Sequence, residues 1–266
     1  MRLGTQDKDF FPKELTEKFA FVKGMGFECF EIDGKVLVEQ AEEVKKAVAV
    51  TGLPVSTACG GYRGWIGDFI EERRTNGVAD LKEILRALQE VGGTGVVIPA
   101  AWGMFTFRLP PMISPRSHEG DVQAILASLK ELDPVAGECG VWLYLEPLNR
   151  YQDHMLNTIQ DAVDIIEAGG FERVKITGDF YHMSIEEDDI SESLRRYAPY
   201  YGHIHIAENH RYQPGSGRID FKRHMAALKE IGYTGDVVNE GRIRGEDPRK
   251  AYQDSVTYMK QFFSGA

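Results

Sequence analysis

Three features are scarce or missing in this chain of 266 residues. It has only three cysteines, Cys29, Cys59 and Cys139, which lie far apart and form no Cys-x-x-Cys pair. This spacing argues against a disulfide framework and against a thiolate zinc site. No run of eighteen apolar residues occurs, and the sequence begins without the apolar segment of a signal peptide. We therefore expect no membrane association and a cytoplasmic location.

Basic residues are in the minority. The chain has 31 Lys+Arg against 41 Asp+Glu, which gives a formal net charge of -10 and a pI near 5.3. An acidic chain repels the phosphate backbone unless its positive charge gathers on one face, so we expect no nucleic-acid partner. With 42% hydrophobic and 27% charged residues, the composition is that of an ordinary globular protein.

Short apolar runs alternate with longer amphipathic segments along the whole chain. Strands are expected at Arg2–Thr5, Phe27–Ile32, Pro54–Ala58, Gly95–Pro99, Trp142–Glu146, Val174–Gly178, Gly202–Ala207 and Asp236–Asn239. Helices are expected near Lys13–Met25, Glu39–Thr51, Asp80–Val91, Asp121–Cys139, Thr158–Ala168, Ser191–Tyr197, Phe221–Ile231 and Pro248–Phe262. Eight such units without a linker predict one (β/α)8 TIM barrel as a single domain, residues 1–266. A doubly wound open sheet is the alternative, but no Gly-x-Gly-x-x-Gly follows the first strand.

In such a barrel, chemistry gathers at the C-terminal ends of the strands. Glu146 ends the fifth expected strand, Asp179 follows the sixth and Glu240 follows the eighth. The seventh strand carries His203 and His205 on one face, and His205 lies nearer its end. Carboxylates converging on one mouth repel each other, and a divalent cation removes that cost. We therefore predict that the three carboxylates and His205 bind one metal ion, with His203 deeper in the barrel.

Three carboxylates and one imidazole suit an oxygen-preferring metal with six ligands better than a closed structural zinc site. Mn2+ is the ion we expect, with Mg2+, Co2+ and Zn2+ as alternatives. Four protein ligands leave two adjacent positions open, which can hold two substrate oxygens such as a ketone and its neighbouring hydroxyl. The substrate class that follows is a small hydroxycarbonyl compound.

The motifs around these residues resemble one known family. They are Glu146-Pro147-Leu148-Asn149-Arg150, Asp179-Phe180-Tyr181-His182-Met183, the run from Gly202 to Arg211 and the terminal Glu240. Together with their spacing, they are similar to the sugar isomerase/epimerase superfamily of xylose isomerase-like barrels. The resemblance is strongest to the ketose 3-epimerases for D-tagatose and D-psicose and to the hydroxypyruvate isomerases. It covers essentially the whole chain and implies the same four metal ligands, with His182 and Arg211 holding substrate oxygens.

One position departs from the ketose 3-epimerase pattern. Those enzymes place a second glutamate six residues after the first ligand, where this chain has Gln152. A neutral amide can hydrogen-bond a hydroxyl but cannot take a proton, which weakens the assignment to a strict ketose 3-epimerase. The alternative role of Arg211 is a surface ion pair with Glu208. Further candidates for substrate contacts are Glu31, Trp65, Trp102 and Phe105.

The reaction we expect is proton transfer at a carbon next to a carbonyl through a metal-bound enediolate. Glu146 and Glu240 are the acid/base pair on opposite faces of the substrate. Return of a proton to the opposite face gives epimerisation, and delivery to the adjacent carbon gives aldose–ketose isomerisation. Loss of a β-hydroxyl gives an inosose dehydratase-type lyase, and a hydroxypyruvate isomerase can use the same site.

Two other function classes are less well supported. An endonuclease IV-like DNA phosphodiesterase needs histidines at the earlier strand ends, where this chain has Ala58-Cys59 and Ala100-Ala101-Trp102. A non-catalytic sugar-binding module has no need of two carboxylates that face one substrate carbon. We therefore predict a divalent-metal-dependent sugar isomerase or epimerase, and the resemblance is compatible with a dimer or a tetramer.

Overall fold

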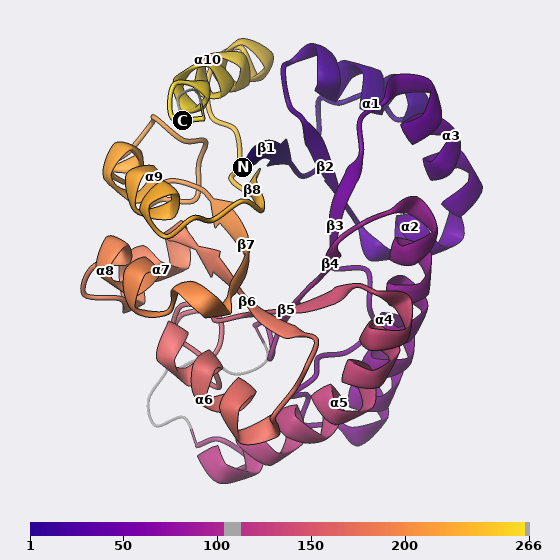
Figure 1. Ribbon diagram of the computed structural model, residues 1–266, viewed down its shortest axis with the longest axis vertical. Helices are drawn as coiled ribbons and strands as arrows, with labels where there is room; N and C mark the ends of the chain where they lie inside the picture. The colour runs from indigo at the N-terminus through magenta and orange to yellow at the C-terminus, as the bar shows by residue number, and fades with distance from the viewer. Residues whose placement is uncertain (104–112, 264–266) are drawn as a thin grey trace.

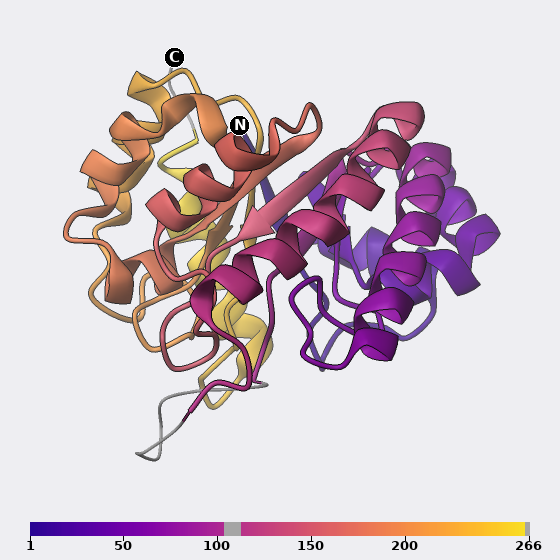
Figure 2. The ribbon, with the colours of Figure 1, turned by 90° about the horizontal axis from the view of Figure 1, so that it is seen from below.

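The structure is a computed structural model, and it describes residues 1–103 and 113–263. These residues form eight parallel strands that close into one barrel in chain order, with helices around the outside (Figures 1 and 2). The strands are β1 (Arg2–Thr5), β2 (Cys29–Ile32), β3 (Val55–Cys59), β4 (Gly95–Pro99), β5 (Trp142–Glu146), β6 (Val174–Asp179), β7 (Tyr201–Ile206) and β8 (Asp236–Asn239). Pairing of β1 with β8 closes the barrel. The predicted (β/α)8 TIM barrel is confirmed.

The helices follow the strands in the expected order. They are α1 (Leu15–Gly24), α2 (Gly34–Glu39), α3 (Ala41–Thr51), α4 (Glu71–Val91), α5 (His118–Cys139), α6 (Ile159–Gly169), α7 (Phe180–Glu186), α8 (Ile190–Arg196), α9 (Phe221–Glu230) and α10 (Pro248–Lys260), with a 3-10 turn η1 (Ala198–Tyr200). Gly52 ends α3 with a φ of 65°, and Gly140 ends α5 with a φ of 67°. Both adopt the left-handed conformation that a glycine after a helix predicts.

Three helical features differ from the prediction. α2 and α7 were not expected, because six or seven residues are too few to show a helical period. Each begins directly after an aspartate, Asp33 or Asp179, whose carboxylate accepts two backbone N–H groups of the first turn. α4 begins at Glu71 rather than Asp80, since its first turns are polar and carry no apolar stripe.

The barrel wall is apolar and densely buried. Every residue of β4 is buried, as expected for a parallel strand with helices on one side and a packed interior on the other. The C-terminal part of the interior is different, because it holds the buried polar side chains of Glu31, Thr57, His203 and His205. Among residues 1–103 and 113–263, no helix has both the length and the apolar character needed to cross a membrane.

Candidate metal centre and active site

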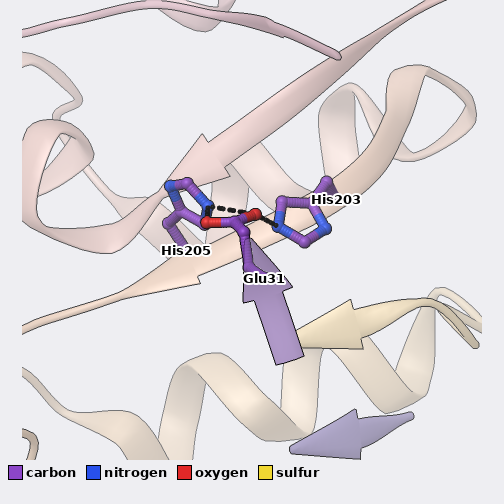
Figure 3. A group of neighbouring side chains, drawn as sticks. All are labelled: Glu31, His203 and His205. Carbon is purple, nitrogen blue, oxygen red and sulfur yellow. Dashed lines mark hydrogen bonds and ion pairs between the residues drawn. The ribbon is translucent and has the colours of Figure 1, made fainter. Parts of the chain in front are cut away.

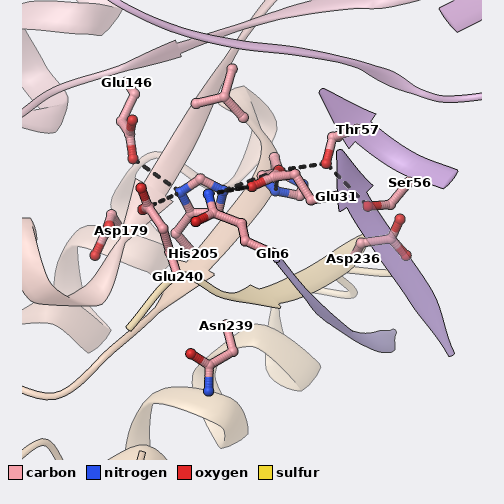
Figure 4. A network of polar contacts seen from close by, with 12 residues as sticks. Gln6, Glu31, Ser56, Thr57, Glu146, Asp179, His205, Asp236, Asn239 and Glu240 are labelled. Carbon is pink, nitrogen blue, oxygen red and sulfur yellow. Dashed lines mark hydrogen bonds and ion pairs between the residues drawn. The ribbon is translucent and has the colours of Figure 1, made fainter. Parts of the chain in front are cut away.

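Four side chains from neighbouring strands meet at the C-terminal end of the barrel (Figure 4). Glu146 ends β5, Asp179 ends β6, His205 lies in β7 and Glu240 directly follows β8. One ligand atom from each lies within 4.8 Å of the others. Strand pairing explains the meeting, because Asp179 lies opposite His205 in the register and the Glu240 N–H donates to the Ile206 carbonyl. The structure thus brings together the four residues predicted as ligands.

The His205 ring directs its two nitrogens to opposite sides. Nδ1 lies 3.2 Å from Glu146 Oε1 and 2.8 Å from Glu240 Oε2. Nε2 lies 3.0 and 3.2 Å from the two carboxylate oxygens of Glu31 (Figure 3). A neutral imidazole with its proton on Nε2 therefore donates to Glu31 and offers its Nδ1 lone pair to a cation among the carboxylates.

Glu31 of β2 lies behind His205 and is 1% exposed. Its carboxylate accepts hydrogen bonds from Gln6 Nε2 at 2.7 Å and Thr57 Oγ1 at 2.5 Å, and His203 Nε2 lies 3.1 Å away. Burial opposes its charge, but His205 and His203 outweigh burial and hold the pKa of Glu31 well below its ordinary value. The side chain points into the barrel toward His205 and His203. The predicted contact of Glu31 with a substrate hydroxyl stays a prediction. His203 lies deeper, as predicted.

His182 lies in the first turn of α7 and is 2% exposed. Its Nδ1 accepts a hydrogen bond from the backbone N–H of Asn149 at 3.0 Å, which leaves the ring proton on Nε2. Nε2 lies 3.8 Å from Asp179 Oδ2, too far for a hydrogen bond. Burial lowers the pKa of His182 to about 4. The ring is therefore neutral at pH 7, with an N–H group that can donate to a substrate oxygen.

Arg211 follows β7 in a left-handed conformation, with a φ of 64°. Its guanidinium forms ion pairs with Asp179 and Glu240 and lies 4.8 Å from the centre of the Tyr181 ring. The alternative pair with Glu208 is not formed, because that carboxylate accepts backbone N–H groups of residues 215 and 219. A non-glycine residue in this conformation costs on the order of 1–3 kcal/mol, so the surrounding loop holds Arg211 in place.

The electrostatics of the cluster favour a bound cation. Burial and the charge of Glu240 raise the pKa of Glu146 to about 7. Burial also opposes the charge of Glu240, but Arg211 and His205 hold the pKa of Glu240 well below its ordinary range. Within the described part of the chain, the buried Oε2 of Glu240 has no hydrogen bond of acceptable geometry, although it lies close to two cationic groups. This oxygen, two further carboxylates and the Nδ1 of His205 together fit a divalent metal ion.

Metal binding is expected to weaken as the pH falls. A cation must displace the proton that Glu146 carries below its pKa of about 7. It must also displace a proton from His205, because burial lowers the pKa of that ring but Glu31 and Glu240 raise it well above its ordinary value. The free-energy cost of displacing each proton rises as the pH falls. The Kd for Mn2+ should therefore rise at least about tenfold from pH 8 to pH 6.

Titration calorimetry in buffers of different ionisation enthalpy measures this affinity and the protons released together. An affinity for Mn2+ that is the same at pH 6 and pH 8, with no proton released, would contradict the assignment of Glu146 and His205 as ligands.

Three other predicted substrate contacts, Trp65, Trp102 and Gln152, lie on loops at the same end of the barrel. Trp102, after β4, is 57% exposed, and Gln152, after β5, is half-buried. The backbone N–H of Gly103 donates to the Gln152 carbonyl at 2.8 Å and joins the two loops. Trp65 is partly buried against the core, and Phe105 lies outside the described residues.

Gln6, which donates to Glu31, and two further polar residues of the site were missed by sequence reasoning. Thr57 of β3 donates to Glu31, and Lys8, after β1, places Nζ 3.4 Å from the carbonyl of Asn239. Burial lowers the pKa of Lys8 to about 8, although Glu240 acts in the opposite direction. Neither residue belongs to a recognisable motif. Lys8 could have been found by its position after the end of β1, whereas Thr57 lies in the middle of β3 and gave no such signal.

Comparison with known proteins reveals long matches. A family model described as "Xylose isomerase-like TIM barrel" matches residues 19–262. A 3-dehydro-D-guloside 4-epimerase from Escherichia coli (strain K12) is 58% identical over 260 residues, which cover 98% of this chain and 99% of that protein. An L-ribulose 3-epimerase from Mesorhizobium japonicum is 30% identical over 231 residues, 84% of this chain and 74% of the relative.

Solved structures agree with these matches. The apo crystal structure of a 3-keto-D-glucoside 4-epimerase from E. coli superposes with a TM-score of 0.97 at 57% identity, covering 98% of this chain and 99% of the other. A D-psicose 3-epimerase from Clostridium cellulolyticum H10, solved with D-tagatose, gives a TM-score of 0.85 at 25% identity, with 100% of both chains covered.

Proposed function

Because this chain belongs to the xylose isomerase-like TIM barrel family of sugar epimerases and isomerases, we propose that it inverts C4 of a 3-keto hexoside with the help of one divalent metal ion. The prediction of an isomerase-class enzyme is confirmed by this membership. The observation that carries the proposal is the meeting of Glu146, Asp179, His205 and Glu240 within 4.8 Å at the catalytic end of the barrel. The activities of the E. coli relatives at 58% and 57% identity support the substrate class.

A 3-keto hexoside suits the chemistry of the site. Its C4 carries a hydrogen next to the ketone at C3, and removal of that proton places negative charge on the ketone oxygen. When bound, a metal ion held by the four clustered side chains supplies the Lewis acidity that stabilises this charge. His182 accepts at Nδ1 and so carries an Nε2–H donor, and the fixed charge of Arg211 lies beside Asp179 and Glu240. Both residues therefore stabilise developing negative charge on substrate oxygens.

Glu146 and Glu240 carry the proton transfers in this proposal. They come from β5 and β8, with β6 and β7 between them, so they approach a substrate over the cluster from different sides. One carboxylate removes the C4 proton, and the other, protonated, returns a proton to the opposite face. The configuration at C4 is then inverted. After one turnover the first carboxyl holds a proton that the second has lost, and exchange with water restores both.

Glu31 is a positioning residue for His205 in this proposal, because its carboxylate accepts from the His205 Nε2–H group. Replacing Glu31 by alanine removes that acceptor and should weaken Mn2+ binding by about 10–100-fold. Glu31→Gln keeps an acceptor oxygen and should lose less affinity. Thr57→Val is the matched control, since it removes a hydrogen bond to Glu31 and leaves the contact with His205. Calorimetric Kd values test the order, and wild-type affinity in Glu31→Ala would remove this role.

The activity is tested by incubating the Mn2+-loaded enzyme with a 3-keto glucoside in D2O. We expect the 3-keto guloside to form, with deuterium at C4 of both epimers, as measured by proton NMR. Free D-psicose, an inosose and hydroxypyruvate serve as comparison substrates for the alternative activities. A non-catalytic binding module exchanges no proton with any of them. Deuterium in D-psicose but none in the 3-keto glucoside would reassign the chain to ketose 3-epimerisation.

Three features of the proposed enzyme stay predictions. They are a single barrel domain over residues 1–266, a cytoplasmic location and assembly into a dimer or tetramer. A small sugar is the partner we propose for the site, and Mn2+ is the ion we propose, with Mg2+, Co2+ and Zn2+ as alternatives.

A further inference from the structure

A groove leads away from Glu240 at the rim of the barrel. It has a volume of about 690 Å³ and runs between the loop after β1 and the segment that joins β8 to α10, with Tyr212 from the loop after β7 at its side. This volume is within the range of roughly 300–1,000 Å³ that is typical of small-molecule sites. Glu240 belongs both to the metal cluster and to the groove wall, so the groove is continuous with the proposed active site.

The groove wall mixes aromatic, cationic and acidic side chains. Besides Glu240, two of each kind contribute to it: Phe10, Tyr212, Lys8, Arg242, Asp7 and Asp9. Hydroxyl groups both donate and accept hydrogen bonds, and the C–H faces of a sugar ring pack on aromatic side chains. A neutral sugar unit therefore finds partners of each type. The three carboxylates of the wall outnumber its two cations and disfavour an anion, and the charged groups disfavour a wholly apolar group.

Lys8 lies in the groove wall beside the end of β8. Its Nζ lies 3.4 Å from the carbonyl of Asn239, the residue before Glu240. Within the described residues this is the single hydrogen bond of the amine, which offers up to three N–H donors. The lowered pKa of Lys8, about 8, agrees with a desolvated position. The amine therefore has donors left for a hydroxyl group in the groove.

The shape of the substrate relates the groove to the reaction. In a pyranose ring C4 and C1 lie opposite each other, so a ring held with C4 between Glu146 and Glu240 directs its C1 substituent away from the carboxylates. Resting on the proposed function, we propose that the groove is the subsite for this substituent and that the substituent is a second sugar unit. The preferred substrate is then the 3-keto derivative of a glucosyl disaccharide, with Lys8 as the donor to the second sugar.

The test compares two substrates of the Mn2+-loaded full chain, a 3-keto methyl glucoside and a 3-keto glucosyl disaccharide. We expect kcat/KM for the disaccharide to be at least about tenfold higher, mostly through a lower KM. Lys8→Met keeps the length of the side chain and removes its donors, so the ratio of the two kcat/KM values should fall toward one. Lys35→Met is the matched control, because Lys35 is exposed on α2, pairs with Glu39 and lines a different cavity.

Binding of the unoxidised disaccharide, measured by calorimetry, separates this inference from the proposed function. If neither substrate turns over but Lys8→Met weakens disaccharide binding at least about fivefold, the subsite stands and the epimerase assignment fails. If both substrates turn over with equal kcat/KM and Lys8→Met changes neither the ratio nor disaccharide binding, the subsite is overturned and the epimerase stands. Loss of the substrate preference in Lys35→Met as well would also overturn the role of Lys8.

Discussion

Replacing Glu240 by glutamine is expected to lower kcat for C4 epimerisation by at least about 10³-fold and to leave the barrel folded. Glutamine has nearly the same shape but can neither take a proton nor offer a charged oxygen to a metal ion. Loss of a general base alone costs about 10²–10⁴-fold. Steady-state kinetics measure the loss, and circular dichroism checks the fold. Glu230→Gln, at the exposed C-terminal end of α9, is the matched control and should retain wild-type activity.

Exchange of the C4 proton with D2O separates the roles of the two glutamates. If each glutamate serves one face of the substrate, Glu240→Gln should still exchange the C4 proton of the epimer whose C4–H bond points toward Glu146. The configuration at C4 should not be inverted in this variant. Glu146→Gln should exchange the other epimer only. The Mn2+ content of each variant is measured first, because loss of the ion would abolish both exchanges. Near-normal turnover in Glu240→Gln would remove its assigned role, and exchange of both epimers by one variant would argue for a single base.

The four candidate ligands could be predicted from the sequence because a parallel barrel brings all of its strand ends to one rim. Asp179 ends β6 and Glu240 directly follows β8, so their side chains had to lie near that rim whatever the helices did. His205 could be chosen over His203 by the same rule. These positions depend on strand order and strand length alone. The structure has the closed barrel and the strand order that the prediction assumed.

The contact between Glu31 and His205 could not be predicted in this way. Glu31 lies in β2 and His205 in β7, and their side chains meet only because the barrel closes and both point inward. The position of Glu31 near the end of the second strand suggested only a hydroxyl contact, and burying a charge at an inward position is costly. Two histidines that face the same carboxylate offset this cost, and this compensation is visible only in three dimensions.

Removing the metal with EDTA is expected to abolish turnover and to lower the Tm. Without a cation, the carboxylates of Glu146, Asp179 and Glu240 repel each other, and His205 and Arg211 offset this only in part. Mn2+ at about 100 times its Kd stabilises the native state by about 2.7 kcal/mol. For a chain of this size that corresponds to a Tm change of roughly 5–10 °C. Differential scanning calorimetry and activity assays with Mn2+ added back measure both effects.

Two aspartate variants locate this effect at the proposed centre. Asp179→Asn should remove most of the Mn2+-dependent rise in Tm, because it takes a charged ligand from the cluster. Asp236→Asn, at the start of β8 and at the opposite end of the barrel, breaks the pair with Arg2 and should lower the Tm without reducing the shift caused by Mn2+. Equal shifts in the two variants would place the ion elsewhere. Turnover that survives complete chelation would contradict metal dependence itself, whatever the Tm values show.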